Sequence, residues 1–190
     1  MKAITAVLLG AGSGTRFGDH KLLHPLPDGT PVGIATARRL VSILPNAVAV
    51  VRRGDDRLAE AYAALGLQVV ENPAAAAGMG TSLATGIAAA PAAAGWLIAL
   101  ADMPWVEPAT LSALAEALRQ GASMVAPVYA GRRGNPVGFA ARWGADLRAL
   151  RGDHGGRKLL STHVAELQLL PVDDPGVLRD VDHRTDLAHT

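Results

Sequence analysis

Short runs of apolar residues alternate with longer segments in which apolar residues recur every three or four positions. The apolar runs cover residues 4–9, 47–51, 68–70 and 96–101. An uninterrupted apolar run is typical of a strand that is covered on both faces. We therefore expect each run to form a buried strand.

Helical spacing fills the segments between these runs. The expected helices cover residues 31–44, 55–65, 81–90 and 108–120. Proline begins the first and last of them, where a missing backbone N–H costs little, and glycine follows the second and last, where a left-handed residue can end a helix. Strand and helix in alternation predict an α/β fold, with a parallel sheet covered by helices on both faces.

The pattern loosens beyond residue 121. The spacing there indicates strands joined through a glycine-rich turn, then a helix, then two shorter strands. These expected elements are two strands within residues 123–143, a helix near 142–150, and short strands at 166–172 and 177–182.

Composition narrows the classes of function. The 190 residues include 18 Lys and Arg, 17 Asp and Glu, and no cysteine. Evenly mixed charge offers no single-sign surface to nucleic acid or an anionic membrane, and the lack of cysteine excludes disulfides, thiolate metal sites and cysteine nucleophiles. The apolar stretch at residues 87–101 is interrupted and shorter than the roughly 20 residues of a membrane span. We expect a cytoplasmic protein that binds neither nucleic acid nor membrane.

No linker or charge block divides the chain, so we expect a single domain over residues 1–190. Its N-terminal part, to about residue 120, carries the regular alternation of strand and helix. Its second part, from about residue 121, carries the looser pattern.

A glycine-rich stretch, LLGAGSGTRFGDHK at residues 8–21, directly follows the first expected strand. Glycine lets backbone N–H groups approach an anion closely, and the Arg and Lys of this stretch add positive charge. The stretch lacks the G-x-G-x-x-G spacing of dinucleotide-binding folds and the G-x-x-x-x-G-K-[ST] spacing of a Walker loop. We therefore expect a phosphate-binding loop of another kind.

This stretch resembles the glycine-loop motif of the MobA-like nucleotidyltransferases, most closely of the molybdenum cofactor cytidylyltransferases. Five further segments resemble family motifs in the family's order: GMGTSLATG, LADMP, GRRGNPVGF, GDHGGR and DVDHRTDL. Two positions depart from the family, Gly10 where alanine is more frequent and Asn135 where histidine is usual. The resemblance implies a Rossmann-like three-layer fold of the nucleotide-diphospho-sugar transferase type, with a mostly parallel sheet.

The resemblance also implies a reaction. A Mg²⁺-dependent enzyme of this kind transfers CMP from CTP to the phosphate of molybdopterin or the molybdenum cofactor and releases pyrophosphate, and a client molybdenum enzyme is a further partner. Because several negative charges meet in such a transfer, catalysis rests mainly on alignment and charge neutralisation. Two alternatives stay open: another nucleotide or phosphorylated acceptor, and a non-catalytic cofactor-binding chaperone of a molybdenum enzyme.

Asp102 is the first candidate for a metal ligand. It follows the apolar run at residues 96–101, so it lies at the carboxyl end of an expected central strand, where ligands of such sheets bind. Mg²⁺ takes one or two protein carboxylates and completes its shell with phosphate oxygens and water. The resemblance implies Asp182 as the second ligand, and Asp180, which would face the same side of a strand, is the alternative.

The resemblance assigns the remaining site residues. Arg16 can bind two phosphate oxygens at once and Lys21 offers a compact charge to the transition state, so these two and Asp102 are the expected catalytic residues. Thr81 or Ser82 fits a helix cap, and the family would also use Ser82 near the nucleoside. The nucleotide-binding set is Leu9, Gly10, Ala11, Gly12, Gly14, Arg16, Lys21, Gly80, Ser82 and Asp102, and the acceptor-binding set is Arg133, Asn135, Asp153 and Arg157.

The third position of the opening loop bears on the nucleotide. In the resembled families it tends to be alanine in cytidylyltransferases and glycine in guanylyltransferases, and here it is Ala11. A methyl group under the base would exclude a purine by shape. The sequence therefore favours CTP.

Overall fold

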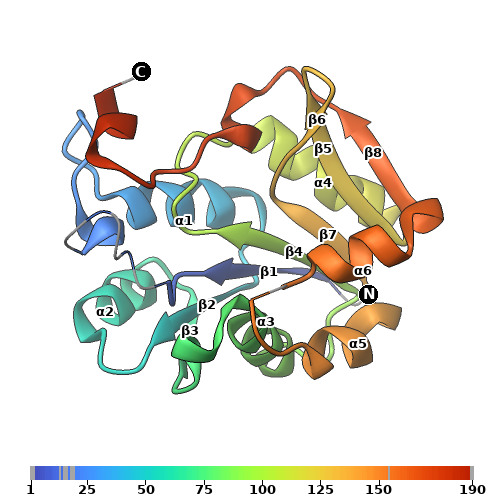
Figure 1. The fold of residues 1–190 in the computed structure, drawn as a ribbon, viewed down its shortest axis with the longest axis horizontal. Helices are drawn as coiled ribbons and strands as arrows, with labels where there is room; N and C mark the ends of the chain where they lie inside the picture. The colour runs from blue at the N-terminus through green and yellow to red at the C-terminus, as the bar shows by residue number, and fades with distance from the viewer. Residues whose placement is uncertain (1–2, 13, 15–16, 18–19, 154, 189–190) are drawn as a thin grey trace.

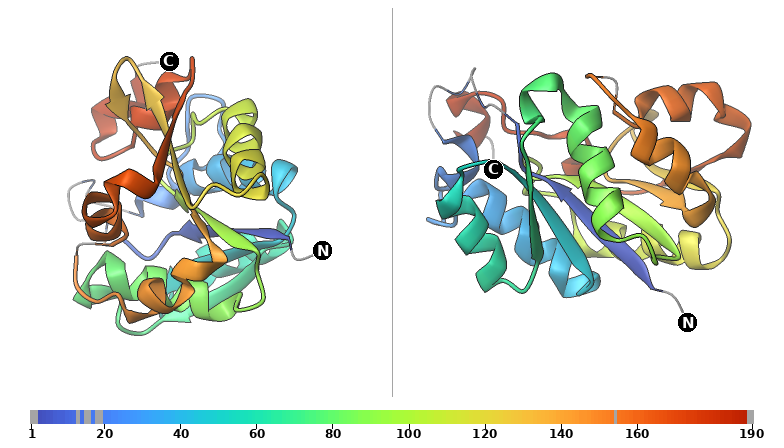
Figure 2. Two further views of the ribbon diagram at one scale, coloured as in Figure 1. Left: turned by 90° about the vertical axis from the view of Figure 1, so that its right-hand side faces the viewer. Right: turned by 90° about the horizontal axis from the view of Figure 1, so that it is seen from below.

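One mixed sheet of eight strands runs through the described residues, with helices packed on both faces (Figures 1 and 2). The computed structural model describes residues 3–12, 14, 17, 20–153 and 155–188. The strand order is β3-β2-β1-β4-β7-β5-β6, with β8 paired to β5. The expected three-layer α/β fold is confirmed.

The expected elements between residues 4 and 120 all form, and their ends agree with the sequence prediction to within two residues. The strands are β1 Ile4–Leu9, β2 Ala47–Arg52, β3 Gln68–Asn72, β4 Gly95–Leu100, β5 Met124–Tyr129, β6 Arg132–Arg133, β7 Val137–Ala140 and β8 Leu167–Pro171. The α-helices are α1 Val32–Ile43, α2 Asp56–Ala64, α3 Met79–Ala89, α4 Pro108–Arg119, α5 Gly144–Ala149 and α6 Arg157–Thr162. Short 3₁₀ helices lie at Lys21–Leu23, Ala75–Ala77, Ala141–Trp143, Val164–Glu166, Pro175–Leu178 and Arg184–Ala188.

The helices end where the sequence indicated. Gly66 after α2 and Gly121 after α4 have φ values of 85° and 101°, the left-handed conformation that lets the chain leave a helix. The longest of the described helices, α1 and α4, have 12 residues. None of the described helices combines the length and the apolar character needed to cross a bilayer.

The parallel half of the sheet is centred on β1. Val7 lies opposite Val48 of β2 and Ile98 of β4, and β3 continues the parallel pairing beyond β2. On the other side, β7 pairs antiparallel with both β4 and β5. Because β1, β2 and β4 are parallel, the loops that follow them meet at one edge of the sheet, which is where ligands bind in this class of fold.

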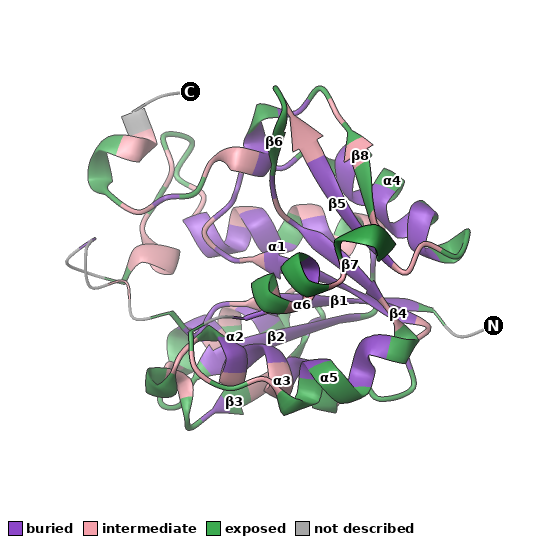
Figure 3. Ribbon diagram, turned by 45° about the vertical axis from the view of Figure 1, so that its right-hand side comes forward, coloured by how far each residue is buried: buried purple, intermediate pink, exposed green. Residues whose placement is uncertain are grey.

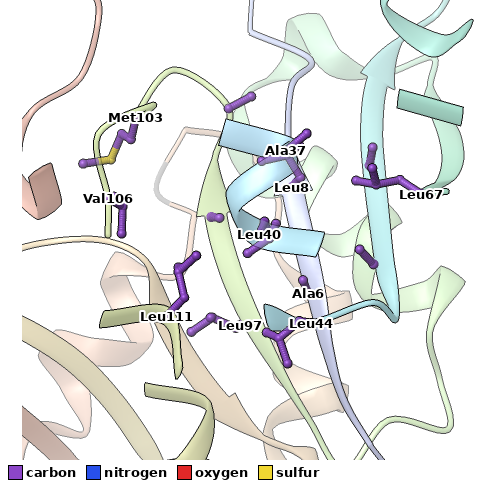
Figure 4. Packing of buried hydrophobic residues seen from close by; sticks show 14 of the residues in the cluster. Ala6, Leu8, Ala37, Leu40, Leu44, Leu67, Leu97, Met103, Val106 and Leu111 are labelled. Atoms are coloured by element: carbon purple, nitrogen blue, oxygen red, sulfur yellow. The ribbon is translucent and has the colours of Figure 1, made fainter. Parts of the chain in front are cut away.

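Alternate side chains of each central strand enter two different cores. Ala6 and Leu8 of β1 pack on the face covered by α1, α2 and α4, where Leu40 lies (Figure 4). Val7 points to the opposite face and joins a cluster with Leu83 of α3 and residues of α5 and α6. The central strands are therefore buried on both sides (Figure 3), as their uninterrupted apolar runs predict.

The segment at residues 177–182 does not form the strand that its alternation predicts. Pro175–Leu178 is a 3₁₀ helix instead. Proline has no N–H to donate to a sheet, and the Asp174 carboxylate accepts a hydrogen bond from the Gly176 N–H at 2.9 Å, which stabilises a tight turn. The expectation of a strand here is wrong because local turn chemistry prevails over alternation.

The alternation of apolar and polar residues in this segment reflects the burial of its apolar side chains rather than pairing in the sheet. Val177 and Val181 are fully buried. Their backbones bind two loops of the sheet edge, since the Asn135 N–H donates to the Val177 carbonyl and the Val181 N–H donates to the Asp102 carbonyl, both at 2.9 Å. The C-terminal segment, red in Figure 1, is thereby fixed at the carboxyl end of β4.

Candidate active site

A cleft of about 510 Å³ opens at the carboxyl ends of β1 and β2. That volume lies within the range of roughly 300–1,000 Å³ that is usual for small-molecule sites. Its walls come from the glycine loop after β1, the 3₁₀ turn that begins at Lys21, the β2–α2 connection and Asp102. The lining residues are Leu9, Gly10, Gly12, Gly14, His20, Lys21, Leu22, Leu23, Arg52, Arg53, Gly54, Asp55, Leu58 and Asp102.

The cleft brings together most of the loop residues assigned to the nucleotide, but not all of them. Arg16 lies outside the described residues. Ala11 is 5% exposed and packs with Val7 and Leu83 in the core beneath α3 rather than lining the cleft. Ala11 is not among the residues that line the cleft, and its effect on the choice of base stays a prediction.

Gly80 and Ser82 lie in α3 and do not line this cleft. The Gly80 N–H donates to the Gly152 carbonyl at 2.7 Å. Ser82 is 5% exposed, and its hydroxyl accepts a hydrogen bond from the Asn72 side-chain amide at 2.9 Å. Ser82 is not a helix cap, because α3 already begins at Met79.

Three carboxylates meet beside the cleft. Asp102 lies two residues beyond the end of β4, and the C-terminal segment carries Asp180 and Asp182. Val181 lies between these two acids in the sequence, and its N–H donates a hydrogen bond to the Asp102 carbonyl. This bond holds both acids near Asp102. One oxygen from each carboxylate lies within 4.8 Å of the others. Both candidates for the second metal ligand, Asp180 and Asp182, therefore lie close to Asp102.

Lys21 lies against this acidic group. Its Nζ is 2.7 Å from Asp102 Oδ2 and 3.3 Å from Asp182 Oδ1, and its side chain is only 12% exposed. Burial alone would lower the pKa of Lys21, but the carboxylates of Asp102 and Asp182 outweigh burial and raise that pKa above its ordinary 10.5. The ammonium group therefore stays charged and offsets part of the acidic charge.

The acidic group suits a hard divalent cation. Burial raises the pKa of Asp180, and the negative charges of Asp102 and Asp182 raise it further. A bound cation relieves such repulsion, and carboxylate oxygens are the ligands that Mg²⁺ prefers. Asp102 and Asp182, with Asp180 adjacent, are the described residues that fit a metal of this kind.

The four residues expected to bind the acceptor fall into two pairs. Arg133 is exposed in β6, and Asn135 is half-buried and donates its backbone N–H to the Val177 carbonyl. Asp153 and Arg157 are exposed, the first in the loop after α5 and the second at the start of α6. Among the described residues, no hydrogen bond or ion pair joins the two pairs, and their assignment stays a prediction.

Sequence reasoning missed the β2–α2 connection. Arg52, Arg53 and Asp55 line the cleft, and Arg52 Nη2 donates to the Gly12 carbonyl at 2.6 Å. The signal was present, because these residues directly follow the expected strand at 47–51. The rule that selected Asp102, which places ligands at the carboxyl ends of parallel strands, applies to them equally.

Comparison with known families decides the class of protein. Residues 6–167 match the MobA-like NTP transferase domain. The chain belongs to this family. The match covers the glycine loop, Lys21 and Asp102, whereas Asp180 and Asp182 lie beyond it.

Solved structures resemble this MobA-like chain along its whole length. Rv0371c from Mycobacterium tuberculosis H37Rv is 29% identical with a TM-score of 0.83, and the match covers 98% of this chain and 96% of that one. A complex of the same mycobacterial protein with manganese is 29% identical with a TM-score of 0.81 and the same coverage. A nucleotidyl transferase from Methanothermobacter thermautotrophicus is 26% identical with a TM-score of 0.83, over 98% of this chain and 94% of that one. No curated protein matches the chain.

Proposed function

We propose that this MobA-like protein transfers CMP from CTP to the phosphate of molybdopterin or the molybdenum cofactor and releases pyrophosphate. The observation that carries the proposal is the contact of Lys21 with Asp102 and Asp182 beside a nucleotide-sized cleft. These residues come from the two ends of the chain and its middle. The ammonium group of Lys21 can offset part of the charge of a triphosphate, and the carboxylates can hold a divalent cation that offsets more of it.

In the proposed reaction, an oxygen of the acceptor phosphate attacks the α-phosphorus of CTP. A new P–O bond forms there, and the bond from the α-phosphorus to the oxygen that bridges it to the β-phosphorus breaks, so that pyrophosphate leaves with the bonding electrons. Asp102 and Asp182 would hold Mg²⁺, which supplies positive charge to the phosphates when bound. A manganese complex of a 29%-identical relative supports a divalent metal in this family.

The protein groups divide the remaining work. Backbone N–H groups of the glycine loop at residues 9–14 hold the nucleotide, and Lys21 exchanges a carboxylate contact for an oxygen of the transferring phosphoryl group. Arg16 binds the triphosphate. The family resemblance assigns Arg133, Asn135, Asp153 and Arg157 to the acceptor, and Gly80 and Ser82 to the nucleoside.

CTP is the proposed nucleotide on the strength of the loop sequence. Ala11 stands at the position that tends to be alanine in the cytidylyltransferases, and here it is packed in the core. A buried methyl group acts by setting the position of the loop backbone rather than by touching the base. A client molybdenum enzyme would receive the product.

Product analysis tests the proposal. Purified protein, Mg²⁺, CTP and purified molybdenum cofactor should yield pyrophosphate and a cofactor heavier by one CMP unit in mass spectrometry. The Asp102→Asn variant is the control for contaminating activity. Binding of cofactor without any pyrophosphate release from any nucleoside triphosphate would support a non-catalytic chaperone instead.

A further inference from the structure

The glycine loop is held by a residue that lies outside it. Arg52, the last residue of β2, donates from Nη2 to the Gly12 carbonyl at 2.6 Å. The bond is exposed to solvent, and its charged donor makes it stronger than a neutral hydrogen bond in the same place. It restrains the Gly12 carbonyl at the wall of the cleft.

A second residue of the same β2–α2 unit supports the loop from below. Tyr62 of α2 is fully buried, and its hydroxyl has no hydrogen-bond partner among the described residues. A Cβ atom at Gly10 would lie 3.3 Å from Tyr62 Cε2, and a Cβ atom at Gly33 would lie 2.7 Å from Tyr62 Oη. A side chain at Gly33 would therefore collide with the Tyr62 hydroxyl, and one at Gly10 would fit only tightly against the ring.

We infer that Arg52 and Tyr62 are positioning residues for the nucleotide, which act by fixing the glycine loop between the Gly12 carbonyl above and the Gly10 backbone below. Neither residue needs to touch the nucleotide. This inference rests on the proposed function, because it assigns the loop the task of binding a nucleoside triphosphate. It also accounts for Gly10, where the resembled family more often has alanine.

The fit explains why the Gly10 departure is tolerated here. A methyl group at this position would meet the Tyr62 ring and, also at 3.3 Å, the Val50 carbonyl. Contacts that short require a neighbour to shift, and neither a buried ring nor a strand carbonyl moves easily. The identity of residue 10 is thus coupled to the presence of Tyr62.

Hydrogen exchange and nucleotide kinetics together test the role of Arg52. In Arg52→Met, we expect faster amide exchange in a peptide covering residues 8–14 and a KM for CTP raised about tenfold, with kcat changed less than about twofold, because one charged hydrogen bond is lost. Arg57→Met is the matched control, since Arg57 is exposed in α2 and does not line the cleft. A raised KM with unchanged exchange would overturn the inference, because Arg52 would then contact the nucleotide itself.

Two substitutions of Tyr62 test whether its aromatic ring positions the glycine loop. Tyr62→Leu should raise the KM for CTP and accelerate amide exchange in the loop. Tyr62→Phe keeps the ring, so this variant should have the wild-type KM and the wild-type exchange rate. In addition, Gly10→Ala should raise KM less in the Tyr62→Leu background than in wild type. Equal effects of Gly10→Ala in the two backgrounds would contradict the coupling.

The loop can be followed even without nucleotide. Should wild-type protein bind no nucleoside triphosphate, the proposed function fails, while faster exchange at residues 8–14 in Arg52→Met and Tyr62→Leu would still support the positioning role. Unchanged exchange in both variants would overturn that role regardless of activity.

Discussion

Asp102 is the single residue on which most of the proposed chemistry depends. It joins the acidic group with Asp180 and Asp182, and it pairs with Lys21 at 2.7 Å. Asp102→Asn keeps the volume of the side chain but removes its charge, so we expect turnover to fall on the order of a hundredfold or more with the thermal stability little changed. Pyrophosphate release and a melting curve measure the two effects.

Substitutions of Asp182 and Asp180 show which of these two acids is the second metal ligand. Asp182→Asn should resemble Asp102→Asn, and Asp180→Asn should have the smaller effect, because Mg²⁺ takes only one or two protein carboxylates. Near wild-type turnover in Asp102→Asn would exclude the acidic group as the metal site.

A substitution of Lys21 distinguishes a role in nucleotide binding from a role in the chemical step. We expect Lys21→Ala to lower the single-turnover rate more than the affinity for CTP, because a charge directed at the transferring phosphoryl group acts mainly in the transition state. Rapid-quench kinetics give the rate, and titration calorimetry gives the affinity. An unchanged single-turnover rate would place Lys21 outside the chemical step.

The buried Tyr62 hydroxyl leads to a prediction about folding stability that does not depend on enzymatic activity. Burial raises the pKa of this phenol, and the charges of Asp55 and Asp102 raise it further, so the group stays neutral. A buried hydroxyl without a partner is destabilising, so Tyr62→Phe should raise the free energy of unfolding by about 1 kcal/mol. Chemical denaturation measures this difference, and a loss of stability would mean that the hydroxyl has a partner in solution.

At the scale of elements, the C-terminal segment shows what local pattern can and cannot predict. Its alternation correctly indicates that Val177 and Val181 are buried, but the segment pairs with none of the strands of the described sheet, and Pro175 begins a 3₁₀ turn. The approach of Asp180 to Asp102 depends on a contact between residues nearly eighty positions apart, which no local spacing encodes. The residue types of the site were predictable, whereas their meeting was not.

The same segment supports a prediction of its own. Val181 is fully buried in a small cluster with Phe17 and Val32. Val181→Ala would leave a cavity, so we expect a loss of stability of about 1–2 kcal/mol and an increase in the Mg²⁺ concentration needed for half-maximal activity. Exposed Val164, changed to Ala, is the control. An unchanged Mg²⁺ requirement would show that this packing does not position the acids.

At the scale of the whole molecule, the sequence predicted the parallel half of the sheet better than the mixed half. Strands β1, β2 and β4 are buried on both faces, so their apolar runs are continuous and easily recognised. The glycine loop and Asp102 followed from that arrangement through the carboxyl-end rule. The roles of Arg52 and Tyr62 did not, because they depend on how α2 packs beneath the loop in three dimensions.

The whole fold assembles one site from the described residues 9–10, 12, 14, 20–23, 52–55, 58 and 102 and the acids Asp180 and Asp182. A competition assay with CTP, GTP, ATP and UTP, the molybdenum cofactor and Mg²⁺ is the decisive measurement of cytidylyl transfer, with pyrophosphate release and product mass as readouts. We expect CMP to be transferred in preference, and Ala11→Gly to admit GTP more readily without making it the preferred nucleotide. A clear preference for GTP in the wild-type protein would contradict the cytidylyl assignment, and no pyrophosphate from any of the four would contradict nucleotidyl transfer itself.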